Sequence, residues 1–419
     1  MTTTTTTTTT PVVPYSSAAA SGTVLTQTWG LLVDSYRELH HKKLFWITLV
    51  LSLLVVLAFA FVGINDVGVT IFTWEIPGVW NTNFIPKDSF YKFLFVSLAI
   101  PFWLGIAASA LALISVAGIF PDMLTGGSID LYLAKPISRL RLFLTKYFCG
   151  LLFVGLQVLV FCTASFFVMG VRGSTWEPGV FLAVPIVTLF FSYLFCICVL
   201  LGVATRSTLV AILLTVLAWF GLWMFNTADG ALLAFKAAAQ QEVAAKQKLV
   251  DFNEDIIKNS TGNTNQFEFQ RDRQRERLVE AQETARKLAF WHTLIVRVKT
   301  PLPKTAETLE LLNRWLVKPD PFFAAEQEQH ARRETRRAQR RATTASATTA
   351  SATSAPATSA PVPPQPPDSL NMYMERPETQ RQIREEITGR SVAWVVGTSL
   401  GFEAVVLSLA AWVFCRRDY

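Results

Sequence analysis

The pattern of apolar and polar residues divides the chain around six apolar runs. A helix needs about twenty apolar residues to cross the hydrocarbon core of a bilayer. The runs cover residues 44–64, 93–120, 148–171, 180–204, 208–225 and 392–414. The pattern therefore predicts an all-α integral membrane protein with six transmembrane helices.

Two of the predicted spans contain a proline. Pro101 lies within the second span and Pro185 within the fourth. Proline removes a backbone donor and frees a carbonyl, which neighbouring helices in a membrane bundle can satisfy. We expect a kink at each position.

The polar stretches set the domain boundaries. Residues 1–22, with nine consecutive threonines, are predicted to be a disordered tail. Residues 23–226 hold an amphipathic stretch at 24–43 and the first five spans. Residues 227–391 form a polar insert, and residues 392–419 hold the sixth span and the C-terminus.

The insert is rich in helix-forming residues over much of its length. Periodicity predicts helices at residues 231–258, 266–298, 305–317 and 380–390. Residues 342–367, built of Ala, Thr, Ser and Pro, are typical of a flexible tether. We expect a helical, partly disordered insert between the fifth and sixth spans.

Composition and charge agree with a membrane protein. The chain is 51% hydrophobic and 16% charged, with a net charge of +7. Because its Lys and Arg residues flank the spans or lie in the insert, the charge does not indicate nucleic-acid binding. The basic span ends all fall on one side, which predicts that both termini are cytoplasmic. The cysteines lie in or at the edges of spans, which excludes an exported domain held by disulfides.

The loop between the second and third spans is basic and amphipathic. Ser128 is a candidate cap for a first short helix, Pro136 ends that helix, and Ser138 is a candidate cap for a second. Apolar residues recur on one face of the second helix, which predicts that it lies at the membrane surface. The cations available to lipid phosphates or an acidic partner are Lys135, Arg139, Arg141 and Lys146.

The same loop carries a family resemblance. Gly127-Ser128-Ile129, then Leu133-Ala134-Lys135-Pro136-Ile137-Ser138-Arg139 and Lys146, resemble the cytoplasmic loop after the second span of ABC-2 type exporter permeases. The chain departs from that pattern at residues 122–125. It also departs from it at Thr145, because the family often has Gly at that position.

The resemblance implies a location, a fold and a set of partners. The chain would lie in the bacterial inner membrane, with an interfacial elbow helix at residues 24–43. Segment 121–147 would dock on a separate ABC ATPase subunit, and a second permease subunit, identical or different, would complete a dimer among membrane lipids. The residues implied in coupling are Ser128, Asp130, Lys135, Pro136, Arg139, Arg141 and Lys146.

No phosphate-binding loop of the type Gly-x-x-x-x-Gly-Lys-[Ser/Thr] occurs in the chain. We therefore expect a non-catalytic permease subunit that binds no cofactor or metal itself, with ATP and Mg²⁺ bound by the partner ATPase. The alternative is a non-transporting membrane protein whose spans anchor residues 227–391 as an interaction module.

Two polar residues inside predicted spans are candidates for function. Glu403 falls near the centre of the sixth span, where an acid must be neutral, paired or next to a polar cavity. It either lines the transport path or dimer seam, or it holds helices together, and Gln157 in the third span is its candidate partner.

Residues 397–401 match the nucleophile-elbow pattern Gly-x-Ser-x-Gly, but close packing of small residues explains them better inside a span.

Overall fold

The computed structural model describes residues 29–30, 32–33, 36–37, 43–72, 74–77, 82, 86–125, 138–259, 265–316 and 377–416. These residues are mostly helical, and they include six helices that are long and apolar enough to cross a membrane. The number of predicted spans is therefore confirmed. The predictions for residues 1–22, 126–137 and 342–367 lie outside the described residues, as does most of 24–43.

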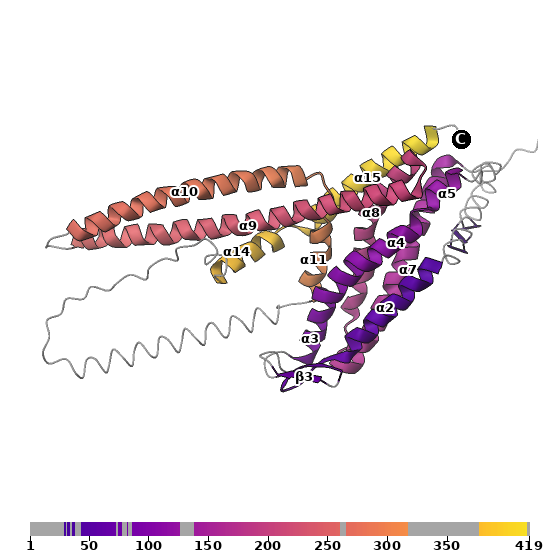
Figure 1. Ribbon diagram of the computed structural model, residues 1–419, viewed down its shortest axis with the longest axis horizontal. Helices are drawn as coiled ribbons and strands as arrows, with labels where there is room; N and C mark the ends of the chain where they lie inside the picture. The colour runs from indigo at the N-terminus through magenta and orange to yellow at the C-terminus, as the bar shows by residue number, and fades with distance from the viewer. Residues whose placement is uncertain are drawn as a thin grey trace, which may run out of the picture.

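The spans are arranged as a bundle around α8 (Figure 1). They are formed by α2 (Lys43–Phe61); by α3 (Lys87–Leu94), η1 (Phe95–Ala108), α4 (Ser109–Val116) and α5 (Ile119–Thr125) in succession; by α7 (Arg139–Gly173); by η2 (Pro178–Leu182) with α8 (Ala183–Thr205); by α9 (Thr208–Asn259); and by α15 (Val392–Arg416). Helix α8 contacts α7, α9 and α15, and its Phe191, Leu194 and Phe195 are fully buried. The hydrophobic core of the protein therefore centres on the fourth span.

The bundle has two distinct ends. At the C-terminal end, the last turn of α5 lies beside the start of α9, and the start of α7 lies beside the end of α15. At the sheet end, α3 is tied to the start of η2 by an ion pair between Lys92 and Glu177, with 2.8 Å between the charged atoms.

A small antiparallel sheet caps the sheet end, which differs from the all-α prediction. Strand β2 (Gly68–Ile71) pairs with both β1 (Val62–Ile64) and β3 (Trp74–Pro77). The strands are too short to produce a readable alternation, and the sequence instead placed Val62–Ile64 at the end of the first predicted span.

The two prolines have different effects. Pro101 lies inside η1, a stretch of wide π-helical turns. At the end of η1, the Ser109 hydroxyl donates to the Leu104 carbonyl at 2.6 Å. Pro185 falls in the first turn of α8, directly after the 3₁₀ turns of η2, so it lies where the chain changes from one helix type to the other. The kink expected there stays a prediction.

The third span also differs from its prediction. Helix α7 runs unbroken from Arg139 to Gly173, and its cap is the predicted one, because the Ser138 hydroxyl accepts from the Arg141 backbone N–H at 3.4 Å. The segment expected at the membrane surface is thus the first part of the span. Its Phe143 is buried inside the bundle, while Leu140 stays exposed.

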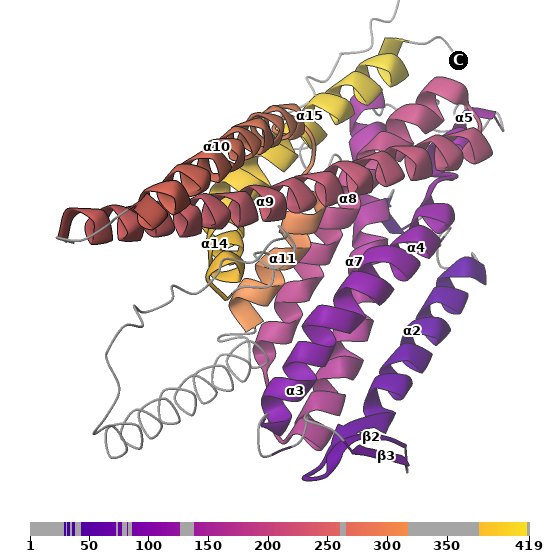
Figure 2. The ribbon, with the colours of Figure 1, turned by 60° about the vertical axis from the view of Figure 1, so that its left-hand side comes forward.

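The described part of the insert is built on α9. This helix continues past the bundle and pairs with α10 (Asn265–Lys299) as a long antiparallel hairpin, which projects to one side in Figures 1 and 2. Helix α11 (Thr305–Leu316) turns back and packs along α8 and η1, and α14 (Pro377–Thr388) packs against α9.

Candidate functional site

Glu403 lies at the interface of three spans. One carboxyl oxygen accepts from the Tyr147 hydroxyl of α7 at 2.8 Å, and the other accepts from the Ser192 hydroxyl of α8 at 2.7 Å. The Glu403 side chain is buried, and the Tyr147 ring stacks on Phe195 with 5.1 Å between ring centroids. These contacts join α7, α8 and α15 in the interior of the bundle.

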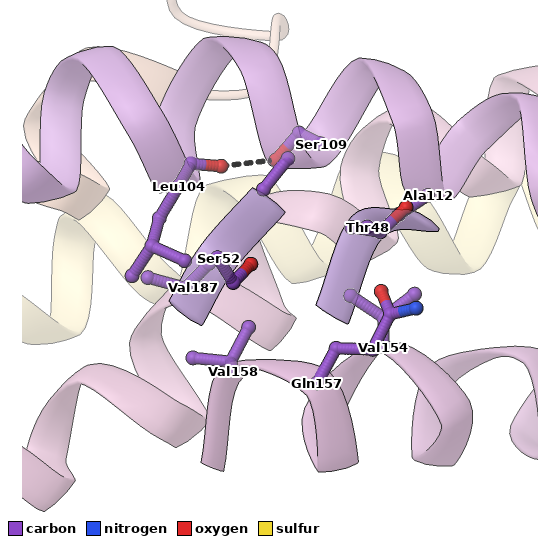
Figure 3. A pocket seen from close by; sticks show the side chains of 10 residues that line it. Thr48, Ser52, Leu104, Ser109, Ala112, Val154, Gln157, Val158 and Val187 are labelled. Carbon is purple, nitrogen blue, oxygen red and sulfur yellow. Dashed lines mark hydrogen bonds between the residues drawn. The ribbon is translucent and has the colours of Figure 1, made fainter. Parts of the chain in front are cut away.

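Gln157 is not among the hydrogen-bond partners that the structure gives Glu403. It lies ten residues beyond Tyr147 on α7, roughly 15 Å along the helix. Its amide points from α7 toward α2 and α4, into a small cavity lined also by Thr48, Ser52 and Ser109 (Figure 3). The cavity has a volume of about 10 Å³, which is at the lower limit for one water molecule. Neither predicted residue therefore lines an open path in this conformation.

A larger cleft lies elsewhere, between η1, α9 and α11. Its volume is about 440 Å³. The indoles of Trp219 and Trp223, the Asn226 amide and the Glu310 carboxylate line it together with the π-helical turns around Pro101. Sequence reasoning missed Glu310, because it sits on an ordinary amphipathic helix of the polar insert, and only the return of α11 to the bundle brings it to this cleft.

The C-terminal end of the bundle holds the described residues of the predicted coupling segment. A guanidinium nitrogen of Arg139 donates to the Cys415 carbonyl at 3.3 Å, which links the first residue of α7 to the end of α15. Arg141 is partly exposed, whereas Lys146 is buried and does not present its charge at the surface. Ser128, Asp130, Lys135 and Pro136 lie outside the described residues.

An aromatic cluster supports this end. Phe143 of α7 lies between Phe120 of α5 and Phe414 of α15, with ring centroids 5.0 Å and 5.6 Å away. All three rings are almost completely buried. Phe143 is one helical turn from both Arg139 and Tyr147, so one face of α7 carries contacts to α15 from the loop to Glu403.

The insert joins the bundle through a second group of polar residues, four of them buried and Arg390 half-buried, which we call the junction cluster: Asp229, His292, Lys299, Glu307 and Arg390. The Lys299 ammonium lies 2.8 Å from Asp229 and 2.6 Å from Glu307. The Arg390 guanidinium lies 3.4 Å from Asp229 and 2.8 Å from Glu307. Burial lowers the pKa of the His292 imidazole, so two carboxylates face two cations beside a neutral ring at pH 7.

The turn after α10 docks on α15 at the Gly-x-Ser-x-Gly motif. The Lys304 backbone N–H donates to the Ser399 hydroxyl at 2.9 Å, and the Lys304 ammonium donates to the Thr398 hydroxyl at 2.6 Å. The motif lies inside a continuous helix, so it is no strand-to-helix elbow. A Cβ added to Gly397 or Gly401 would meet nothing within 4 Å, so these glycines do not provide close helix packing within the described chain either.

Two substitutions of Glu403 separate the contribution of its hydrogen bonds to stability from the contribution of its charge. Glu403→Gln keeps one acceptor for Tyr147 and gains a donor that can reach the Ser192 oxygen, so we expect a melting temperature close to wild type. Glu403→Leu leaves the Tyr147 hydroxyl short of its partner and should cost about 1–3 kcal/mol. Thermal unfolding of the purified protein in detergent compares the two. Equal stability of the two variants would contradict a helix-locking role.

The junction cluster should contribute far more to stability than an exposed ion pair on the same two helices. Asp229→Asn leaves Lys299 and Arg390 with a single buried carboxylate, and we expect a loss of about 3–5 kcal/mol. Glu254→Gln is the matched control, because Glu254 pairs with Arg275 across α9 and α10 at 2.6 Å in an exposed position. Thermal unfolding should show a large drop for the first variant and little change for the second. Similar drops in both would contradict the assignment.

Neither a metal site among the described residues nor a comparison with known proteins identifies a function for the chain. Among the residues that the structure describes, no group of three or more His, Cys, Asp or Glu side chains is placed to hold a metal ion. No protein-family model, curated protein or solved structure matches the chain.

Proposed function

We propose that the chain is the membrane subunit of an ABC-2 type exporter, which couples ATP hydrolysis by a separate subunit to substrate movement across the bacterial inner membrane. The observation that carries the proposal is how the basic loop resembling the coupling segment is anchored. Both of its ends enter the bundle at the aromatic cluster of Phe120, Phe143 and Phe414, so a force on the loop would act on three spans together.

The distribution of basic residues supports the orientation. Lys43, Arg139, Arg206 and Arg416 all belong to the C-terminal end of the bundle, which is therefore cytoplasmic in the proposal. The hairpin of α9 and α10 is then extracytoplasmic, and both termini are cytoplasmic.

A mechanical route leads from the loop into the membrane. Movement of Arg139 would carry α15 with it through Cys415, and the contact of Tyr147 and Ser192 with Glu403 would extend the same movement to α8. In this mechanism Glu403 transmits motion and does not touch substrate. Closure of the ATPase subunits would rock this rigid group of helices and change access to the path.

The cleft between η1, α9 and α11 is the best candidate for part of the substrate path. It combines room, aromatic surface and the Glu310 carboxylate, and the π-helical turns of η1 give its wall a backbone that deviates from a regular helix. A second permease subunit would close the open side of the path, and residues 24–43 would form the elbow helix. ATP and Mg²⁺ would bind the partner ATPase.

The second candidate is a non-transporting protein that uses residues 227–391 as an interaction module. The length of the hairpin favours it, because α9 and α10 extend well beyond the bundle (Figure 1). A hairpin that captured partner proteins equally well with an altered loop at residues 126–137 would support this function.

The exporter proposal predicts that an ATPase copurifies with the chain. The tagged protein is purified from its native membrane in mild detergent, and the bound proteins are identified and assayed for ATP hydrolysis. Lys135→Glu with Arg139→Glu should abolish recovery of the ATPase, because charge reversal opposes docking on an acidic surface. Lys248→Glu is the matched control, since Lys248 is an exposed cation of the hairpin.

Each result of that experiment decides between the two functions. Loss of the ATPase in the loop variant alone, with an unchanged melting temperature, places the coupling segment. A chain that never copurifies with an ATPase, or that binds only proteins held by the hairpin, overturns the exporter proposal.

A further inference from the structure

The last turns of α10 carry an apolar face that no described part of the chain covers. Phe290, Leu294 and Val298 follow one another at four-residue spacing, with side chains that are 63%, 40% and 46% exposed. The opposite face of the same turns carries His292 and Lys299, which point into the junction cluster. One side of this segment is therefore charged and buried, while the other carries exposed apolar side chains together with one exposed cation, Arg297, whose long side chain can extend toward the water-facing part of the helix.

The exposed face of α10 changes character before this segment. Toward the start of the helix, the same line of positions carries Glu276, Glu280, Glu283 and Lys287, all of them exposed. Val279 is an exposed apolar residue among these charges. An ordinary water-facing helix surface thus gives way to an apolar one within a single turn, between Lys287 and Phe290.

Helix α9 changes at the same level. Its exposed large apolar side chains begin at Leu209 and end at Phe235. The contacts of Asp229 with Lys299 and of Glu254 with Arg275 set the register of the antiparallel pair, so Phe235 lies level with the α10 turn around His292. Beyond this height α9 has no exposed large apolar side chain, and α10 has only the separate Phe269 and Val279 among its charged residues.

The length of α9 allows that height to be the surface of a bilayer. The 208–235 segment is roughly 40 Å long, whereas the hydrocarbon core is about 30 Å thick. A helix with such an excess fits by tilting, and α9 is inclined to α7 and α8 in Figure 1. With this placement the fifth span would extend beyond the boundary at residue 225 that the sequence predicted.

We propose that lipid acyl chains of the leaflet on the hairpin side cover Phe290, Leu294 and Val298, so that the end of α10 and the junction cluster lie below the bilayer surface. Helix α11 agrees with this placement. It begins directly after Lys304, whose backbone N–H donates to Ser399 in the interior of α15, and it ends at Leu316, beside Gly179 at the sheet end of the bundle. The segment from Phe290 to Leu316 therefore enters the leaflet and leaves it again on the same side.

The interaction surface extends beyond the proposed exporter function, because it holds for a transporter and for an anchored interaction module. The same placement also explains why the charges of the junction cluster are paired with one another. The charges of the cluster that are buried at this depth must be paired within the protein, and the apolar residues of α10 lie between them and the lipid.

Cysteine labelling tests the lipid contact directly. Leu294→Cys and Val279→Cys are made in a Cys415→Ser background, because the remaining four native cysteines are buried. The intact protein is reconstituted in lipid nanodiscs and reacted with a charged, membrane-impermeant maleimide, which reaches both membrane faces. We expect Leu294→Cys to react about tenfold or more slowly than Val279→Cys, because a thiol in an apolar environment does not ionise. Both should react equally after SDS denaturation.

Two results would overturn the proposal. Equal labelling of the two positions in nanodiscs would show that the face meets water. Rapid crosslinking of Leu294→Cys to itself by a mild oxidant, with no such crosslinking of Val279→Cys, would show that a second copy of the chain covers the face. Phe290→Cys and Val298→Cys repeat the measurement should Leu294→Cys fail to fold.

Discussion

The pairing of buried polar side chains is the constraint on which the arrangement of this protein depends. An unpaired acid or cation in an apolar environment costs so much that the chain must supply its partners, and here the partners come from segments far apart in sequence. Glu403 requires Tyr147 and Ser192, and this requirement brings three spans into a defined contact. The junction cluster does the same for the insert, because Asp229, Lys299, Glu307 and Arg390 come from four separate stretches of chain.

These two groups of polar residues define two regions of the molecule. The C-terminal end of the bundle joins the basic loop to α15 through Arg139 and the aromatic cluster, and from there to Glu403. The opposite region joins the hairpin to the cleft of about 440 Å³, since α11 lines that cleft and carries Glu307 into the junction cluster. Helix α15 takes part in both regions, because its Glu403 contacts α7 and α8 and its Ser399 accepts from the Lys304 backbone N–H.

The acids Glu403 and Glu310 lie in different surroundings. Glu403 is enclosed by α7 and α8 and joins both helices to α15. Glu310 faces an open cleft beside two tryptophans, where a carboxylate and indole rings can together attract an amphipathic cation. The polar cavity at Gln157 is too small for a substrate and marks a place where α2, α4 and α7 meet.

The sequence by itself determined the features that depend on local pattern. Apolar runs of bilayer length predicted six spans, and the helical periodicity of 231–258 and 266–298 lies within α9 and α10, because these signals need no knowledge of distant contacts. Ser138 was readable as a cap for the same reason.

Tertiary structure alone decided the partners of Glu403, the burial of Lys146 and the return of α11 to the bundle. A polar residue in a sequence shows that a partner is needed but does not show which of many distant candidates supplies it. The small sheet was equally hidden, because strands of three or four residues form only when α2 and α3 bring their ends together.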